Sequence, residues 1–369
     1  MKKILVVLLV LAVAGGAFAQ QGSWDISGNA KVGTILDFNT SPIPATGDSI
    51  DGEVSISYSL NGLSASIGFH AFGAISGSAE YEGNNYKFKV AGNLLEIDPT
   101  ALSGSDVVGI GTVAPGELWG YYKLVGGMIH LEAAYKGRDN GWWSSNDTAT
   151  LVADVGFNWA NLNGGNGLLA AIEIANLSGG IILPNLFDNG VAHPLMDDVF
   201  KKLIFGFKID MDPINFAGQF KVENYGVYIG AEAKFAMLTF GLSFLGTFET
   251  AVDAGVGLKI AYDADPLSAY IGVAMGLKGD PLKTNFVINP GFAYKVIPDY
   301  LLFKVDAKFG IGPDDALTWN VEPGVFWNFR GSGANDDPGT GFLFKYKLAG
   351  GNSGTTDNNL FIGFKWNFF

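Results

Sequence analysis

The sequence predicts an all-β protein, a transmembrane antiparallel up-and-down β-barrel of about 20 strands, with about 18 strands as the alternative count. Two observations carry this prediction. Segments of about ten residues alternate apolar and polar side chains along the chain, as membrane-spanning strands do. The mean hydropathy is +0.23, yet no segment after the N-terminus approaches the roughly 18 consecutive apolar residues of a membrane helix. In lipid every backbone polar group must be paired, and a closed barrel achieves this with short alternating segments.

The N-terminus predicts a secretory signal peptide over residues 1–19, cleaved after Ala19, followed by a single barrel domain over residues 20–369. Two lysines precede an apolar stretch over residues 4–13, and small residues stand before the cleavage point, as in signal peptides. That stretch is too short for a membrane helix, which takes about 20 residues. The chain has no cysteine, which excludes disulfides and a lipid-modified N-terminal cysteine.

The alternating segments follow one another from the start of the predicted mature chain to its end. Trp24 and Ile26 alternate with Asp25, and the segments 202–211, 301–311 and 341–348 each place aromatic and aliphatic side chains on one face and charges on the other. This period of two is typical of strands with one apolar and one polar side. A soluble β-sandwich or solenoid, which also alternates, stays open as the alternative fold.

The connections predict which strand ends lie together. Assigning residues 97–115 to one loop gives an even strand number, which bacterial single-chain barrels require. Long connections then fall on one end of the barrel and short turns on the other. The long ones are 38–51, 97–115, 137–149 and 177–201; the short ones contain Asn61 and Gly62, Gly126 and Gly127, Asp212 and Pro213, and residues 263–266. The eleven-residue connection 330–340 breaks this rule.

The last ten residues, LFIGFKWNFF, form the most apolar alternating segment of the chain. This segment resembles the C-terminal strand of bacterial outer-membrane β-barrels, porins especially, which ends in an aromatic residue, usually Phe. The resemblance implies an outer-membrane location, contact with outer-membrane lipid, and recognition by the barrel-assembly machinery. The implied assembly signal is Phe364, Trp366, Phe368 and Phe369, with Phe369 out of phase with the apolar face.

The chemistry of the sequence favours a channel over an enzyme. His130 and Glu132 share the polar face of one segment, but no serine nucleophile can be assigned to them. The sequence has no P-loop, zincin or Cys/His spacing, so no cofactor or metal is expected. Alternation begins almost at once, which excludes the plug domain of energy-coupled receptors. We therefore predict a porin for small hydrophilic solutes, with a surface structural protein or adhesin as the alternative; the oligomeric state is left open.

The charges predict a basic interior. The chain is acidic overall, with 23 Lys+Arg against 36 Asp+Glu, which argues against nucleic-acid binding. Within the predicted strands, however, eighteen lysines fall on the polar phase against eleven acids. Fixed positive charge in a narrow channel concentrates anions, so the sequence predicts an anion-preferring channel. The lysines predicted to line the lumen are Lys208, Lys221, Lys234, Lys259, Lys304, Lys308, Lys345, Lys347 and Lys365.

The connection 177–201 is the longest and carries many apolar residues. Exposed apolar surface costs about 25 cal/mol per Å², so this loop should bury it. Porins commonly fold a long loop into the barrel, and the resemblance makes this loop the candidate constriction. A lid at the rim or a contact between subunits is the alternative. The candidate residues are Ile181, Ile182, Leu186, Phe187, Asp197 and Asp198.

Overall fold

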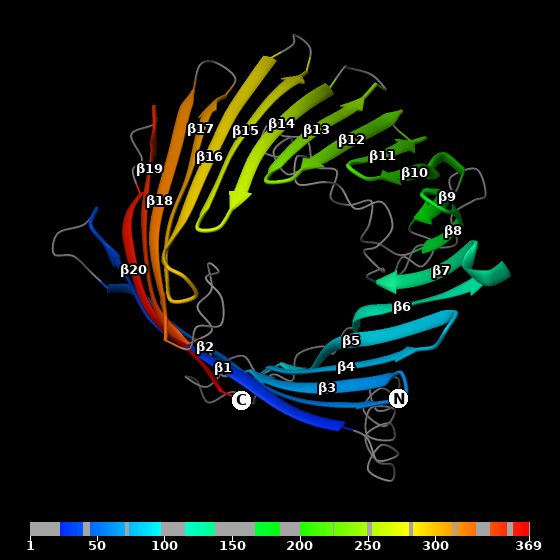
Figure 1. Ribbon diagram of the computed structural model, residues 1–369, viewed down its shortest axis with the longest axis horizontal. Coiled ribbons are helices and arrows are strands. Elements are labelled where there is room, and N and C mark those ends of the chain that lie inside the picture. The colour runs from blue at the N-terminus through cyan, green and yellow to red at the C-terminus, as the bar shows by residue number, and fades with distance from the viewer. Residues whose placement is uncertain are drawn as a thin grey trace, which may run out of the picture.

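The chain forms a closed ring of strands in a computed structural model (Figure 1). Residues 1–22, which include the predicted signal peptide, lie outside the part of the chain that the structure describes. The described residues are 23–39, 45–70, 74–96, 115–136, 167–184, 200–223, 225–248, 253–279, 283–312, 316–329, 340–352 and 357–368.

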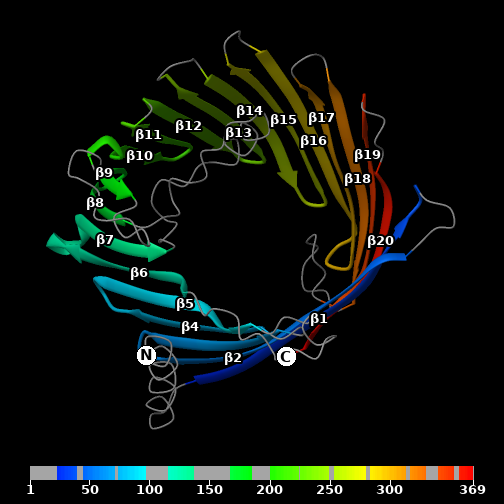
Figure 2. The ribbon, with the colours of Figure 1, turned by 180° about the vertical axis from the view of Figure 1, so that it is seen from behind.

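Twenty antiparallel strands make the ring, each paired with its neighbours in sequence, which confirms the predicted fold class and strand number. The view from behind shows the same continuous wall (Figure 2). Among the described residues, no helix is long and apolar enough to cross a membrane. The strands are β1 Ser23–Asp37, β2 Ala45–Leu60, β3 Leu63–His70, β4 Ala74–Glu82, β5 Tyr86–Glu96, β6 Pro115–Leu124, β7 Ile129–Lys136, β8 Gly167–Ile174, β9 Leu177–Pro184, β10 Ile204–Met211, β11 Ile214–Lys221, β12 Gly226–Phe235, β13 Leu238–Thr247, β14 Asp253–Ala264, β15 Leu267–Lys278, β16 Lys283–Ile297, β17 Leu301–Ile311, β18 Leu317–Asn328, β19 Gly341–Gly351 and β20 Asp357–Phe368.

The barrel closes where β20 pairs with β1. The register runs from Gly28 opposite Phe368 to Asp37 opposite Asn359, and β20 pairs with β19 on its other side. The apolar C-terminal segment is therefore the closing strand. Without this pairing β1 and β20 would both be open edges, and closure satisfies their backbone groups.

One end of the barrel carries the shortest turns, and we call it the short-turn end. Asn61 and Gly62 join β2 to β3 with φ values of 45° and 83°. A Cβ on Gly62 would stand 2.1 Å from the carbonyl oxygen of Glu82, so this position requires glycine. Ala175 and Asn176 join β8 to β9 at the same end. The predicted short turns are confirmed at Asn61 and Gly62, at the 3₁₀ turn η2 (Val125–Gly127), and at the cis Asp212-Pro213 and Asp265-Pro266 bonds.

The other end, which we call the loop end, carries the connections that follow the odd-numbered strands, and two of them were predicted too long. Strand β2 begins at Ala45, inside the predicted connection 38–51. Strand β9 occupies Leu177–Pro184, the first eight residues of the predicted connection 177–201. Ala175, with φ of 50°, reverses the chain there, and Ile182 lies opposite both Leu169 and Ile204.

The strand count was right, although the residues of β9 had been assigned to the connection 177–201. The structure places β8 and β9 at this point in the barrel, and residues 137–166 lie outside the described part of the chain. The apolar run of β9 was interpreted as loop surface, whereas backbone pairing on both sides and burial of Ile182 explain it as strand.

Candidate functional site: the polar face of the wall

Most strands present one apolar and one polar face. On the apolar face large side chains are exposed, for example Phe344 (38%), Ile271 (45%) and Trp327 (51%). On the polar face lysines form ion pairs with acids of the same and of neighbouring strands. The outside of a membrane barrel must be apolar. We therefore assign the apolar face to the lipid and the polar face to the interior.

The predicted lysines all lie on strands and on this polar face. Ion pairs of five of these lysines are described, and three of these pairs join residues two positions apart on one strand, where both side chains point the same way. The Nζ to carboxylate distances are 2.8 Å for Lys208–Asp210, 3.1 Å for Lys221–Glu223, 3.0 Å for Lys234–Glu232, 2.9 Å for Lys304–Asp306 and 3.2 Å for Lys347–Asp357.

Aromatic rings also stand on the polar face, and sequence reasoning missed them. The Nζ atom of Lys345 lies 5.3 Å from the ring centre of Phe326, and that of Lys31 lies 5.4 Å from the ring centre of Phe361. Lys259 stands over Tyr270 at 5.2 Å. These are cation–π distances. The signal was available, because Phe361 and Phe326 are aromatic residues in the polar phase of their strands.

The wall carries no excess of positive charge, unlike the prediction. Within the strand bounds stand seventeen lysines and eighteen acids. The difference arises because several strands run further than predicted and include acids that had been assigned to connections, such as Glu117, Asp253 and Asp357. Lys202, predicted in a strand, precedes β10 instead.

The charges are divided between two sides of the ring. Strands β1–β9 hold five lysines and eleven acids, whereas β14–β20 hold nine lysines and five acids. Strands β10–β13 between them hold three lysines and two acids. Figure 1 shows β14–β20 as one continuous arc. The wall is therefore basic on one side of the ring and acidic on the other.

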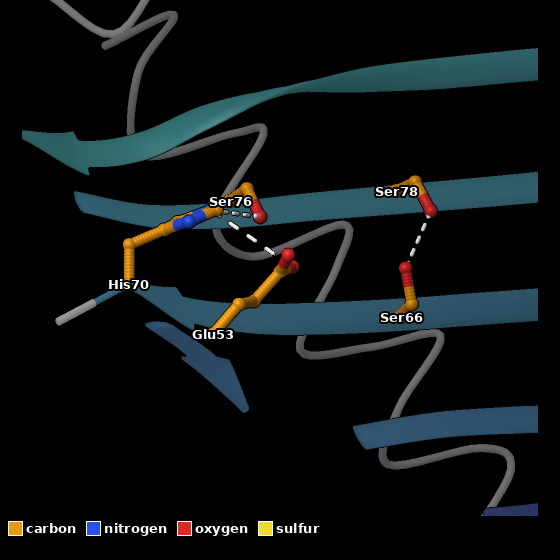
Figure 3. Close-up of polar contacts among 5 residues, drawn as sticks. All are labelled: Glu53, Ser66, His70, Ser76 and Ser78. Carbon is orange, nitrogen blue, oxygen red and sulfur yellow. Dashed lines mark hydrogen bonds and ion pairs between the residues drawn. The ribbon is translucent and has the colours of Figure 1, made fainter. Parts of the chain in front are cut away.

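The acidic side contains a patch of hydroxyl groups. On the polar faces of β2–β4, the hydroxyls of Ser66 and Ser78 lie 2.7 Å apart, and His70 Nε2 lies 3.3 Å from Ser76 Oγ (Figure 3). Glu53 lies 3.9 Å from the same His70 nitrogen. Hydroxyls both donate and accept hydrogen bonds, so this patch can replace part of the hydration shell of a passing solute.

Two apolar clusters interrupt the polar face. One joins Leu302, Phe326 and Leu343, which are only 3–4% exposed, with Ala293 and Phe361 packed against it. The other joins Leu169, Ala171, Ile182 and Ile204, each 2–3% exposed, near the loop end. The members of the second cluster lie on β8, β9 and β10.

The candidate constriction residues are only partly where they were predicted. Ile181 and Ile182 belong to strand β9 and not to a loop: Ile181 faces outward and is 41% exposed, and Ile182 faces inward and is 2% exposed. The physical reason is the strand alternation described above. Leu186, Phe187, Asp197 and Asp198 lie outside the described residues.

His130 and Glu132 do lie together on the polar face. His130 Nε2 is 3.4 Å from Glu132 Oε2, both side chains are buried, and the Tyr121 ring lies 4.6 Å from the imidazole ring. Among the described residues, no group of three or more His, Asp or Glu side chains could hold a metal ion. His130 and Glu132 therefore form a buried polar contact within the barrel wall.

The predicted assembly signal belongs to the closing strand. Trp366 is 50% exposed on the apolar face, and the Phe364 ring lies 5.2 Å from that of Phe342 and 6.2 Å from that of Phe329. The backbone of Phe368 pairs with Gly28. Phe369 lies outside the described residues.

No family model matches the chain, and no curated protein matches it. Solved structures do. Pseudomonas aeruginosa OpdO has 10% sequence identity and a TM-score of 0.51, and the match covers 94% of this chain and 97% of that chain. Pseudomonas aeruginosa OccK2 (OpdF) in complex with glucuronate has 9% identity and a TM-score of 0.51, covering 94% and 98%. These neighbours are outer-membrane porins. At such identities the likeness shows the fold alone.

Proposed function

We propose that this chain is an outer-membrane porin, a water-filled channel for the passive diffusion of small hydrophilic solutes and ions. The observation that carries the proposal is a closed 20-strand barrel with one face apolar and the other lined by charges and hydroxyls. Barrels of about 16–18 strands or more leave an aqueous channel. The likeness to OpdO and to the glucuronate complex of OccK2 supports the passage of small solutes.

The division of charge leads us to propose weak ion selectivity. The predicted anion preference depended on a net positive wall, and lysines and acids are balanced within the strands. An anion would pass nearer the β14–β20 side and a cation nearer the β1–β9 side. Because charges are screened beyond about 8 Å at physiological salt, each side acts on solutes close to it. Strong selectivity would require a narrow segment that brings every solute close to one side.

We propose that the connection between β9 and β10 provides such a narrowing. The apolar cluster of Leu169, Ala171, Ile182 and Ile204 offers an interior surface on the two strands that the connection joins, where Leu186 and Phe187 could pack. Asp197 and Asp198 would then bring negative charge into the passage. Removing residues 186–198, which spares β9 and β10, should raise the single-channel conductance.

Planar-bilayer recording with the purified protein tests the proposal. We expect stepwise conductance, a small reversal potential in a salt gradient, and a larger step for the 186–198 deletion. An inserted, folded barrel that never conducts would contradict the porin and favour the surface-display alternative. If the deletion inserts but leaves the step unchanged, the narrowing is wrong while the channel stands.

A further inference from the structure

The polar face of strands β1–β4 is built largely from hydroxyl groups, and we call it the serine face. These four strands hold ten of the thirteen serines that lie within the strand bounds. Figure 1 shows the four strands side by side. Ser57 stands opposite Asp25 on one side and opposite Ser66 on the other, and Ser66 stands opposite Ser78. One row of side chains across the four strands therefore offers three hydroxyls and a carboxylate.

A second row on the serine face has the same composition. Ser23, Ser59 and Ser64 lie in register, with Glu80 at the end of the row. Successive rows are two residues apart along each strand, about 6.8 Å, and neighbouring strands are about 4.8 Å apart. A small solute with a hydroxyl on most of its carbon atoms therefore spans several of these hydroxyls at once.

The hydroxyls keep hydrogen-bonding capacity for such a solute. The Oγ atoms of Ser66 and Ser78 lie 2.7 Å apart (Figure 3). A hydroxyl has one donor and two acceptor lone pairs, so the bond between these two leaves one donor and three acceptor positions. A solute hydroxyl has the same capacity as water to donate and to accept. It therefore replaces water at these positions without leaving a polar group unpaired.

The serine face is open to the interior of the barrel. None of its serines with described side chains is buried, and Ser27 and Ser64 are exposed. On β8, β12 and β13, by contrast, the inward side chains of Leu169, Tyr228 and Leu245 are only 0–3% exposed. A solute inside the barrel therefore has access to the serine face, whereas these other inward side chains are out of its reach.

The charge of the serine face favours solutes without a negative charge. Strands β1–β4 hold seven acids and a single lysine, Lys31, within their bounds. Glu80 is paired with Lys87 of β5 at 3.0 Å, whereas Asp25 is exposed in its row of serines. A carboxylate accepts hydrogen bonds from hydroxyls, and bonds to an ionised acceptor are stronger than bonds between neutral groups. The same acids repel a carboxylate or phosphate on the solute.

His70, Ser76 and Glu53 on this face are the residue types of a hydrolase triad, but their geometry favours binding. His70 Nε2 lies 3.3 Å from Ser76 Oγ and 3.9 Å from Glu53 Oε1 (Figure 3). In a triad the serine and the acid contact opposite nitrogens of the imidazole. Here both face the same nitrogen, so the acid does not orient the imidazole towards the serine. The three side chains add hydrogen-bonding groups to the serine face.

We propose that the serine face is a binding surface for uncharged sugars. The proposal rests on the proposed channel, because a sugar reaches this face only from the interior of the barrel. A sugar carries hydroxyls on most of its carbon atoms and no charge, which matches the rows of hydroxyls, their exposure and the acidic charge around them. An amino acid carries a carboxylate and few hydroxyls, so it matches this face less well.

Block of the ion current by glucose tests the proposal on the unmodified channel in a planar bilayer. A bound sugar obstructs ions only while it occupies its site, so the current reduction should saturate with glucose concentration. Glucuronate, which differs from glucose by a carboxylate, is compared at constant total potassium concentration. Its half-saturating concentration should be about tenfold higher, equivalent to about 1.4 kcal/mol. A short polyethylene glycol of similar size, which lacks the row of hydroxyls, should reduce the current without saturation.

Two triple variants locate the site. Ser57→Ala, Ser66→Ala and Ser78→Ala together remove the hydroxyls of one row and keep each Cβ. The control removes three hydroxyls from the polar faces of β13, β15 and β18, with the substitutions Thr239→Val, Ser268→Ala and Thr318→Val. The half-saturating glucose concentration should rise about tenfold for the serine-face variant, equivalent to about 1.4 kcal/mol, and stay within about twofold of the unmodified channel for the control.

Three results would overturn the proposal and leave the channel intact. Block by glucose that does not saturate, like that by polyethylene glycol, would mean obstruction without a site. Glucuronate block as strong as glucose block would contradict the role of the acids. Equal shifts for the two triple variants would place the site elsewhere. If the serine-face variant does not insert, the comparison of glucose with glucuronate on the unmodified channel still decides. A folded, inserted barrel that never conducts would contradict the channel itself, and sugar binding inside it as well.

Discussion

Replacing Leu343 by alanine should destabilise the barrel more than the same change on its lipid face. Leu343 is 3% exposed on the polar face of β19 and packs with Leu302 and Phe326. Removing three carbon atoms forfeits about 2.4 kcal/mol at about 0.8 kcal/mol for each. Neighbouring side chains cannot fully collapse into the space, so a cavity term brings the total to about 4 kcal/mol, within the range for buried Leu→Ala changes.

Leu258→Ala is the matched control. Leu258 lies on the apolar face of β14 and is 45% exposed. Lipid tails can fill the space that the smaller side chain leaves, so we expect only the transfer cost of about 2.4 kcal/mol. Urea unfolding of both variants in micelles or vesicles, followed by tryptophan fluorescence and the gel shift of folded barrels, measures the difference.

The difference between the two variants tests the interior packing. We expect Leu343→Ala to lose about 1.5 kcal/mol more than Leu258→Ala, the cavity term alone. Equal losses would mean that Leu343 has no packed neighbours. A larger loss for Leu258→Ala would refute the assignment of the two faces.

Three further predictions concern the wall and its charges. Gly341→Ala should impair folding, because its Cβ would stand 1.7 Å from the Trp327 carbonyl oxygen. Gly312→Ala should be tolerated, because its Cβ would lie 3.5 Å from the nearest atom. Equal yields of folded barrel for the two variants would contradict this prediction. Trp366→Ala together with Phe364→Ala should slow membrane insertion more than export, measured by fractionation, and normal insertion would remove the proposed role of these residues in assembly. The double variant Asp25→Asn with Glu53→Gln should shift the reversal potential in a salt gradient towards anion selectivity. The double variant Lys31→Gln with Lys345→Gln should shift it towards cation selectivity. An unchanged reversal potential would mean that these side chains lie away from the path of the ions.

The sequence predicted the barrel, its strand number and its closing strand because the period of two is strong in most segments, as in 301–311 and 360–368. It failed where a strand resembles loop surface. The segment Leu177–Pro184 is nearly all apolar or glycine, so alternation could not show that Ile181 faces outward and Ile182 inward. That difference appears only when β8 and β10 pair on either side.

The predicted charge balance of the wall depended on where each strand was predicted to begin and end, and a sequence indicates strand ends only weakly. Extending β6 to include Glu117 and β14 to include Asp253 moves acids from connections into the wall. The ion pair of Lys89 with Glu117, 2.5 Å between Nζ and carboxylate, shows that such an acid stands among the wall lysines. Phe326 and Phe361 on the polar face were missed because an aromatic residue there breaks the alternation by which the faces were assigned.

Cysteine scanning along β17 tests most directly that the polar face lines a water-filled channel. Single cysteines at Lys304, Asp306 and Lys308 should react with a charged, water-soluble thiol reagent added to the conducting channel, and each reaction should change the conductance. Cysteines at Phe303, Val305 and Ala307 should neither react nor change it. Reaction at the second set, or reaction at the first set without any change in conductance, would contradict the account.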